Sequence, residues 1–533
     1  MALVNVRRWL GAALGLWVLD VALTLQDVWP TPGVQWVGEV SVELAVLLLL
    51  FCLAYAVRRR PCAPAAARAA AAVLVVLTLG RYAAITAPAL YGRPINLYWD
   101  FPHLSNVMGM LSAVAPAWAL LAGTLAVGLL LWGLYAGLLW CVRSLLRVLE
   151  TPRAAATTAC FAAAVVLAFV LRWHAGGGLA PFAEPVLATY AAQVRLVADG
   201  MGGSAAARAV PASPALRSSL AALARGDVLV MFLESYGSST YDRPEFAAAL
   251  APTRLHLAQV IGQTHREVVS AFVTSPTFGG GSWLAHLTLM SGIRVSDPGR
   301  YALLMTQQRD TLATAFREQG YRTVGMMPGM RLAWPEGRFY HFDVIHDAAA
   351  LQYTGPEFGW FRIPDQFSLA KLLQLELAPN PRAPAFVLFP TLSTHLPFRP
   401  VPSYQPDWQR MLTAEPFDAP ALRQALAQSP AWLNMGESYV AALQYAFASL
   451  AGFLLEHQDP RLVVVLLGDH QPAANTSGEN ASWDVPVHIL TGNQKVLAAL
   501  RTRGFEDGLA PNRKPLGGME ALTPLLLEAF EAP

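Results

Sequence analysis

Apolar residues dominate the first third of the chain, where they form five runs long enough to cross a bilayer, which takes about 20 residues. These runs cover residues 9–25, 40–57, 69–88, 111–142 and 154–173. The fourth run is longer than a bilayer requires, so we expect it to tilt or to begin as an interfacial helix. The pattern predicts a membrane domain over residues 1–174 with five transmembrane helices.

Basic residues are distributed unevenly around these runs. They cluster before the first run, between the second and third, and between the fourth and fifth, as Arg7, Arg8, Arg58, Arg59, Arg60, Arg68, Arg143, Arg147 and Arg153. Because Lys and Arg favour cytoplasmic loops, we expect the N-terminus in the cytoplasm and everything after Trp173 outside it. This arrangement predicts a multi-pass protein of a bacterial inner membrane with a periplasmic or extracellular C-terminal domain.

A different pattern begins at Gly226. Short aliphatic runs predict strands at residues 228–233, 267–273, 323–326, 386–389, 462–467 and 487–490, and helical stretches between them include 311–319, 366–377 and 435–456. Apolar strands that alternate with helices predict an α/β domain with a mainly parallel sheet over residues 226–533. Residues 175–225 start with three glycines, contain one predicted helix at 183–198, and join the two domains as a linker.

Composition supports a membrane protein with a water-soluble part. Hydrophobic residues make up 54% of the chain and charged residues only 14%, against about 25% charged in an ordinary soluble protein. The net charge of +2 gives no indication of nucleic-acid binding. The four cysteines are Cys52, Cys62, Cys141 and Cys160. Since none follows residue 160, the C-terminal domain has neither a disulfide framework nor a cysteine-ligated zinc site.

Ligand-type side chains follow two of the predicted strands, where sites in α/β sheets lie. Glu234 ends the first strand, and Asp469 and His470 follow the strand at 462–467. A carboxylate and an Asp-His pair at strand ends suit a hard divalent cation, and Gly468 gives the backbone room to turn. The alternative is that Glu234 caps a helix and that Asp469 and His470 lie in an ordinary solvated loop.

A candidate nucleophile follows three consecutive glycines. Gly279, Gly280 and Gly281 precede Ser282 at the start of a helical segment, so backbone N–H groups can approach an anion there. The positive end of a helix and a nearby metal ion would lower the pKa of the Ser282 hydroxyl and make it a nucleophile. The alternative is that Ser282 only caps the helix.

A histidine follows a fourth strand end. His395 lies in the segment Ser393-Thr394-His395-Leu396-Pro397, just after the strand at 386–389. It could hydrogen-bond a phosphoryl oxygen or protonate a leaving group, whereas a lone loop histidine is otherwise structural or exposed.

Four motifs in this order resemble the lipoteichoic acid synthase-like branch of the sulfatase and alkaline phosphatase superfamily. They are Phe-Leu-Glu234-Ser, Phe-Gly-Gly-Gly-Ser282-Trp, Ser-Thr-His395-Leu-Pro-Phe and Gly-Asp469-His470. The resemblance covers the whole chain. It implies one Mn²⁺ or Mg²⁺ held by Glu234, Asp469, His470 and the nucleophile hydroxyl, and a covalent phospho-enzyme on that hydroxyl.

Two features depart from this family. Its nucleophile is commonly Thr, where this chain has Ser282. The resemblance implies that Trp334 and Arg338 contact a phosphoglycerol, but their spacing is altered. Sulfate-ester hydrolysis is not expected, because Ser282 is followed by Trp-Leu-Ala-His and lacks the sequence that yields formylglycine.

The sequence thus predicts a membrane-bound transferase. It would move a phosphoglycerol-type head group from a phospholipid to a glycan or lipid acceptor through a phospho-serine. The alternatives are a phosphoethanolamine transferase, which the lack of cysteines after Cys160 disfavours, and a phosphodiesterase that uses water as acceptor. A non-catalytic envelope scaffold with a degenerate phosphatase-like domain is an alternative of another class.

Overall fold

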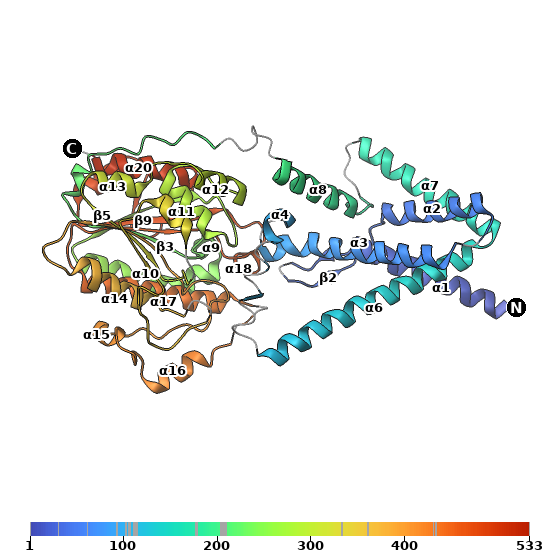
Figure 1. Cartoon of the computed structure of the whole chain (residues 1–533), viewed down its shortest axis with the longest axis horizontal. Coiled ribbons are helices and arrows are strands. Elements are labelled where there is room, and N and C mark those ends of the chain that lie inside the picture. Colours follow the sequence, from blue (N-terminus) through green and yellow to red (C-terminus); the bar gives the residue numbers. More distant parts are fainter. Residues whose placement is uncertain are drawn as a thin grey trace. The chain divides into compact units, whose positions relative to one another are not determined.

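A computed structural model describes residues 2–29, 31–60, 62–91, 94–101, 104, 108–109, 116–175, 180–202, 210–331, 334–359, 362–429, 431 and 434–531. The chain divides into two compact units, Met1–Gly203 and Ser204–Pro533 (Figure 1). The expected linker at 175–225 is shared between them. Helix α8 (Val186–Gly202) packs on α3 (Pro64–Tyr91) in the first unit. Leu216, Leu220 and Leu223 are buried in the second. The predicted glycine run at 176–178 lies outside the described residues.

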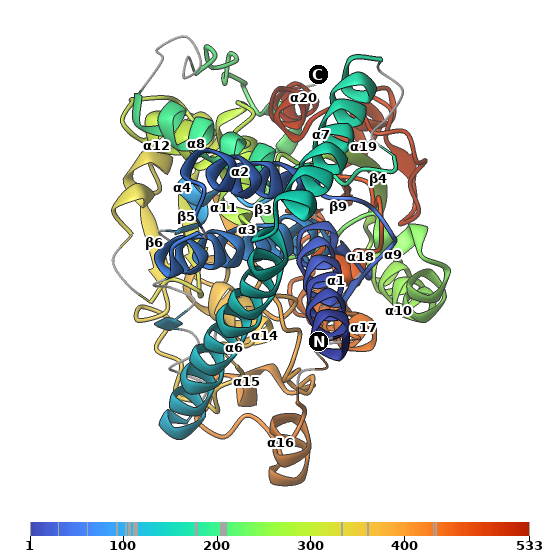
Figure 2. The ribbon, with the colours of Figure 1, turned by 90° about the vertical axis from the view of Figure 1, so that its right-hand side faces the viewer.

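The first unit is a bundle of apolar helices (Figure 2). Its helices are α1 (Ala2–Thr24), α2 (Val42–Arg58), α3, α4 (Leu97–Asp100), α6 (Ala117–Leu149), α7 (Pro152–Ala175) and α8, and two short strands, β1 (Gln26–Asp27) and β2 (Val34–Gln35), pair at one turn. α1 packs on α6, and α2 packs on α7. The five predicted spans overlap α1, α2, α3, α6 and α7 in turn, although residues 111–115 of the fourth span lie outside the described residues.

The number of membrane crossings is not confirmed as five. Within the described residues, four helices are long and apolar enough to cross a membrane, at Pro64–Pro88, Ala117–Leu149, Pro152–Ala175 and Gly436–Glu456. The last of these is α17, which belongs to the second unit and is largely buried there. Helix α2 is short for a span at 17 residues, and α1 carries Arg7, Arg8 and Asp20.

The second unit is built on an eight-stranded sheet in the order β10-β4-β9-β8-β3-β7-β5-β6. The strands are β3 (Val228–Leu233), β4 (Glu267–Thr274), β5 (Arg322–Met327), β6 (Val344–Asp347), β7 (Ala385–Pro390), β8 (Val463–Gly468), β9 (Asp484–Thr491) and β10 (Glu506–Asp507). The strands β8, β3, β7, β5 and β6 are parallel, whereas β9 is antiparallel to β8 and β4, and β10 to β4. The expected α/β class with a mainly parallel sheet is confirmed, and β6 and β10 are additions to the predicted strands.

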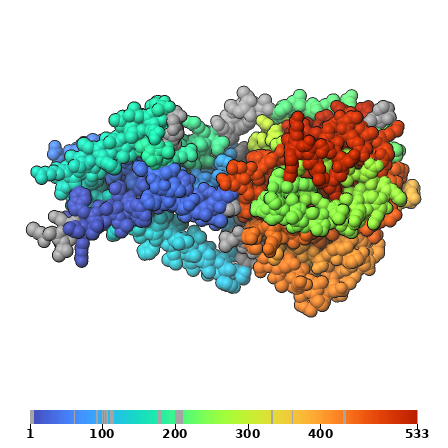
Figure 3. All heavy atoms as spheres, turned by 180° about the vertical axis from the view of Figure 1, so that it is seen from behind, coloured from blue at the N-terminus to red at the C-terminus, as the bar shows by residue number. Residues whose placement is uncertain are grey.

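Helices cover both faces of this sheet (Figure 1). They are α9 (Ser239–Asp242), α10 (Pro244–Gln263), α11 (Ser282–Ser291), α12 (Pro298–Met305), α13 (Leu312–Glu318), α14 (Asp365–Leu372), α15 (Trp408–Met411), α16 (Ala419–Leu426), α17 (Gly436–Glu456), α18 (Ala474–Ser477), α19 (Gln494–Arg501) and α20 (Met519–Glu531). Short 3₁₀ helices lie at Ala221–Leu223 and Pro335–Tyr340, and a π-helical segment lies at Leu373–Leu377. In the space-filling view, α10 (light green) and the C-terminal segment (red) lie on one side of the unit (Figure 3).

The two-sided cover explains why the central strands read as unbroken apolar runs. Alternate side chains of a strand point to opposite faces. In β3, Val228, Val230 and Phe232 join the core under α11, α13 and α20, whereas the residues between them join the core under α10, α14 and α17. Every position of β3 is buried. The residue that follows such a strand therefore lies at the carboxyl end of the sheet, between the two helical layers and shielded from solvent.

Candidate metal centre and nucleophile

Two neighbouring parallel strands place ligand-type residues side by side. β3 and β8 are paired with Leu233 opposite Gly468, so Glu234 and Asp469 are the next residues at the same edge of the sheet. A side chain at Gly468 would collide with the Tyr236 carbonyl oxygen. Glycine at this position therefore lets the two strand ends approach each other.

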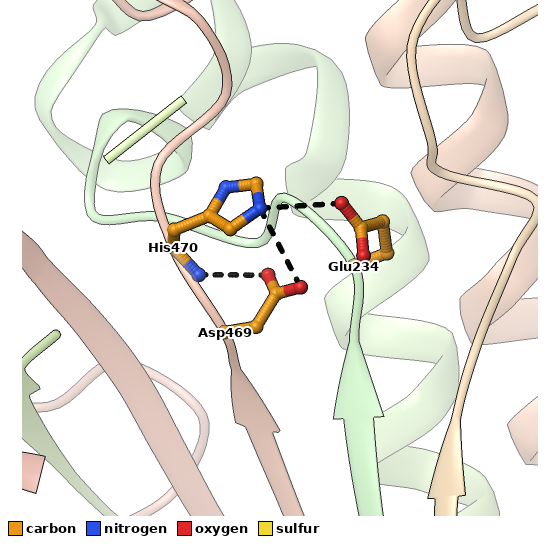
Figure 4. A group of neighbouring side chains, drawn as sticks. All are labelled: Glu234, Asp469 and His470. Carbon is orange, nitrogen blue, oxygen red and sulfur yellow. Dashed lines mark hydrogen bonds and ion pairs between the residues drawn. The ribbon is translucent and has the colours of Figure 1, made fainter. Parts of the chain in front are cut away.

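Glu234, Asp469 and His470 converge in the interior of the second unit (Figure 4). The Nε2 atom of His470 lies 3.3 Å from Glu234 Oε1 and 3.6 Å from Asp469 Oδ2. One ligand atom from each of the three residues lies within 4.8 Å of the other two. The side chains are almost fully buried, with exposed fractions of 7%, 0% and 2% for the three residues. The arrangement is a compact set of two carboxylates and one imidazole.

One carboxylate oxygen of this set lacks a hydrogen-bond partner. Asp469 Oδ1 accepts the backbone N–H groups of Ser235 and His470, each at 2.7 Å, but the buried Oδ2 accepts none from the described residues. Its nearest cationic neighbour is His470 Nε2 at 3.6 Å, which also pairs with Glu234, and two buried carboxylates beside one imidazole are costly unless they bind a counter-ion. An Asp, a Glu and a His around one point are ligands that Mn²⁺ and Mg²⁺ accept. The residues present therefore fit a divalent cation.

The electrostatics of the three groups are strongly coupled. Burial and the nearby charge of Glu234 raise the pKa of Asp469 well above its usual value. Burial alone would lower the pKa of His470, but the charges of Asp469 and Glu234 outweigh it and raise this pKa to about 9. Burial alone would raise the pKa of Glu234, but its hydrogen bond to His470 holds it below the usual range. Two buried carboxylates thus compete for one positive charge.

Ser282 joins this group from the start of α11. Its Oγ donates to Glu234 Oε2 at 2.8 Å and lies 3.1 Å from His470 Nε2. Gly279, Gly280 and Gly281 approach it with φ values of 67°, 146° and 77°, which only glycine adopts readily. Ser282 is the first helical residue and makes no capping bond, since Gly281 is the cap. The hydroxyl therefore faces the candidate ligands and does not cap the helix.

His395 lies at the same edge of the sheet, after β7. Phe232 of β3 is opposite Pro390 of β7, which leads directly into the loop that carries His395. Its half-buried ring lies 2.7 Å from the Leu396 carbonyl oxygen through Nδ1, and its charge contributes to the low pKa of Glu234. The structure thus places His395 near the three ligands but outside their compact set.

Two further residues that the sequence did not identify hold the His395 loop. Asp365, the first residue of α14, is fully buried and accepts the backbone N–H of Leu392 at 2.7 Å and of Ser393 at 3.0 Å. Thr391 Oγ1 accepts the N–H of Glu234 at 3.1 Å. Burial raises the pKa of Asp365 to about 6. These bonds fix the His395 loop relative to the end of β3.

A buried histidine on α11 was also not anticipated as a site residue. His286 lies one turn after Ser282, and its ring centroid is 4.5 Å from that of Phe232. Its Nε2 is buried without a hydrogen-bond partner in the described chain. Burial lowers the pKa of His286 to about 4, which keeps the ring neutral under ordinary conditions. It therefore adds no positive charge beside Ser282.

Trp334 and Arg338, the two residues expected to contact substrate, differ in their surroundings. The Trp334 ring packs on that of Tyr340, with ring centroids 5.3 Å apart. The Tyr301 ring lies 4.4 Å from that of Trp283, which follows Ser282 on α11. Arg338 is exposed on the turn Pro335–Tyr340, and its guanidinium makes no hydrogen bond or ion pair with the described residues.

Comparisons with known proteins show similarity in structure only. No protein-family model matches the chain, and no curated protein matches its sequence. The chain is similar to the lipoteichoic acid synthase LtaP from Listeria monocytogenes, with 15% identity and a TM-score of 0.40 over 64% of this chain and 78% of that one. It is similar to the phosphoglycerol transferase GacH from Streptococcus pyogenes, with 13% identity and a TM-score of 0.36 over 61% and 85%.

A third similar structure is a protein in the alkaline phosphatase superfamily from Vibrio parahaemolyticus, with 18% identity and a TM-score of 0.35 over 53% of this chain and 63% of that one. The solved structures that this chain resembles are sulfatase-like proteins of the alkaline phosphatase superfamily.

Proposed function

We propose that this protein is a membrane-bound, metal-dependent transferase that moves a phosphoglycerol-type head group from a phospholipid to a glycan or lipid acceptor. The observation that carries the proposal is the position of Ser282. Its Oγ lies 2.8 Å from Glu234 Oε2 and 3.1 Å from His470 Nε2, in the same cluster as Asp469 Oδ2, which accepts no hydrogen bond from the described residues. A hydroxyl placed among candidate metal ligands is suited to attack phosphorus.

Glu234, Asp469, His470 and the Ser282 hydroxyl would hold one Mn²⁺ or Mg²⁺. When bound, such an ion neutralises phosphoryl oxygens and lowers the pKa of a coordinated hydroxyl. Burial of Glu234 and Asp469 excludes water from this side of the nucleophile. The buried carboxylates are therefore better neutralised by a bound cation than by water. The other side of Ser282 is open to solvent and is left for the substrate.

The reaction would proceed in two displacements at phosphorus. Ser282 Oγ releases its proton to solvent and bonds to phosphorus, while the bond from phosphorus to the diacylglycerol-type alcohol breaks. His395 protonates the departing alkoxide, and the positive end of α11 stabilises the charge on the phosphoryl group. The acceptor hydroxyl then gives its proton to the now neutral His395 and bonds to phosphorus, while the bond from phosphorus to Ser282 Oγ breaks and the serine takes a proton from solvent.

Attachment to membrane helices supports a lipid donor. The helices α3, α6 and α7 are long and apolar enough to span a bilayer. A domain tethered to the membrane meets lipid head groups at a high effective concentration, whereas a soluble phosphate ester would need no such tether. We therefore infer that the donor is a phospholipid in the leaflet facing the second unit.

The direct test is mass spectrometry of the purified full-length protein after incubation with Mn²⁺ and phosphatidylglycerol vesicles. We expect an adduct with the mass of a glycerophosphoryl group on the peptide that contains Ser282. Phosphatidylethanolamine vesicles test the alternative head group in the same way. Turnover without an adduct on Ser282 from either lipid would contradict the proposed intermediate. Analysis of the lipid products separates transfer to an acceptor from hydrolysis by water.

Asp365 should act as a positioning residue for His395. In Asp365→Asn, the amide NH₂ would face a backbone N–H of Leu392 or Ser393, so one of the two bonds would be lost. We expect kcat to fall by about ten- to a hundredfold, because small displacements of a catalytic group are costly. Mn²⁺ affinity, measured by calorimetry, should stay unchanged. A loss of Mn²⁺ binding would instead mean that Asp365 supports the strand ends as a whole.

The matched control is Asp343→Asn. Asp343 also accepts a backbone N–H, that of Thr323 at 2.8 Å, but it lies beside β5, away from the His395 loop. We expect its kcat to equal that of the unaltered protein. If both variants lost the same activity, the effect of Asp365 would be one of general stability.

A further inference from the structure

A hollow in the first unit lies between α2 and α7. It has a volume of about 640 Å³, within the range of roughly 300–1,000 Å³ typical of small-molecule sites. The α2 wall consists of large aliphatic residues such as Leu49 and Leu53, and the α7 wall of the small residues Ala155, Ala156 and Ala159. The hollow exists because the alanines leave unfilled space opposite the leucines. Its walls are apolar along most of their length.

One end of this hollow is strongly basic. Arg59 lines it and takes a left-handed conformation that ends α2, with its backbone N–H bonded to the Tyr55 carbonyl oxygen. Arg58 and Arg60 flank Arg59, and Arg153 follows the lining residue Pro152; all three are exposed, and none of the four arginines forms an ion pair within the described residues. The only acidic residue in the adjoining turns is Glu150. This end therefore carries an uncompensated positive charge.

A hydrogen bond also joins the two walls of the hollow at its basic end. The Tyr55 hydroxyl, which lines the hollow, donates to the Glu150 carbonyl oxygen at 2.7 Å. This bond links the end of α2 to the turn that precedes α7. The arginine end and the apolar walls are thus fixed relative to each other within one unit.

We propose that this hollow binds an anionic phospholipid, with an acyl chain between α2 and α7 and the phosphate against Arg59 and its neighbours. An apolar wall that ends in unpaired arginines matches the two chemistries of such a lipid. The lipid would come from the leaflet that the arginine-rich end faces. The site is separate from the Ser282 chemistry proposed above, and its test requires no catalytic activity.

The test is native mass spectrometry of the full-length protein taken from nanodiscs that contain equal amounts of phosphatidylglycerol and phosphatidylcholine. We expect preferential retention of one phosphatidylglycerol. Arg59→Gln combined with Arg60→Gln should lower that preference about fivefold for each arginine removed. Arg7→Gln with Arg8→Gln is the matched control, because it removes two exposed arginines from α1 without touching the hollow. The control should retain the preference.

A second pair of variants tests the apolar part. Ala156→Leu with Ala159→Leu should fill the hollow and abolish retention, whereas Ala163→Leu places a leucine on α7 outside the lining and should not. Equal retention of both lipids by the unaltered protein would overturn the proposal. The proposal would also be overturned if the arginine variant kept the same lipid preference as its control. A third contrary result would be a protein dimer without bound lipid that the two leucines dissociate.

Discussion

Replacing Ser282 with alanine should abolish head-group transfer, with a fall in kcat of at least about a thousandfold, because a nucleophile has no substitute within the site. Ser282 is the first residue of α11 and makes no capping bond, so its loss should leave the helix intact. Because the Oγ also donates to the buried Glu234 carboxylate, we expect the free energy of unfolding of the metal-free protein to fall by about 1–3 kcal/mol. Release of labelled diacylglycerol from phosphatidylglycerol by the full-length protein measures the activity.

Two further variants make this result specific. Ser282→Thr keeps a hydroxyl at the same atom and should retain measurable transfer. Ser291→Ala removes a buried serine from the other end of α11, where its Oγ donates to the Leu287 carbonyl oxygen at 2.7 Å. That change should lower stability by about 1 kcal/mol without lowering kcat. Persistent turnover in Ser282→Ala would show that another group attacks phosphorus and would end the phospho-serine proposal.

The strand ends could be predicted because the central sheet is buried on both faces. Its inner strands read as uninterrupted aliphatic runs, so the first polar residue after each run marks a strand end. Glu234 after β3 and Asp469 after β8 were located in this way, within one residue of the observed ends. The adjacency of β3 and β8 could not be read from the sequence, because strand order depends on packing among segments more than 200 residues apart.

The strands that sequence reasoning missed are short and lie at the sheet edges. β6 has four residues, ends in His346 and Asp347, and is only partly buried. β10 has two exposed residues, Glu506 and Asp507. Backbone pairing of β6 with β5 and of β10 with β4 defines these two strands. Their sequences show no alternation of apolar and polar residues that would predict them. Such strands are fixed by tertiary contacts that a local pattern cannot reveal.

Asp365 illustrates the same limit at the candidate site. An acidic residue in the first turn of a helix is an ordinary stabilising feature, and Pro364-Asp365 before an apolar stretch reads as nothing more. Its carboxylate instead bonds the loop after β7, 27 and 28 residues further along the chain. Helix α17 shows the converse case, since its length and hydropathy fit a membrane span but its side chains pack under the sheet.

Replacing Asp469 with asparagine should weaken Mn²⁺ binding by at least about a hundredfold, since even residues behind the ligands commonly account for ten- to a hundredfold. Asparagine keeps the Oδ1 acceptor for the N–H groups of Ser235 and His470. It removes the negative charge of Oδ2, which lies 3.6 Å from His470 Nε2 and accepts no hydrogen bond within the described residues. Metal-free Asp469→Asn should therefore unfold at the same temperature as the metal-free parent, or higher, because the repulsion between two buried carboxylates is gone.

The two melting temperatures, measured with and without Mn²⁺, separate a ligand from a structural residue. A cation that binds only the folded parent stabilises it by RT ln(1 + [Mn²⁺]/Kd), so at a Mn²⁺ concentration well above the parent's Kd and below that of the variant the gain in Tm should be large for the parent and nearly absent for Asp469→Asn. Asp343→Asn should keep the full gain. A purely structural Asp469 would give the opposite pattern, with a lower metal-free Tm and an undiminished gain from Mn²⁺. That result would contradict a cation site at Asp469 and, with it, the proposed activation of Ser282 by a bound cation.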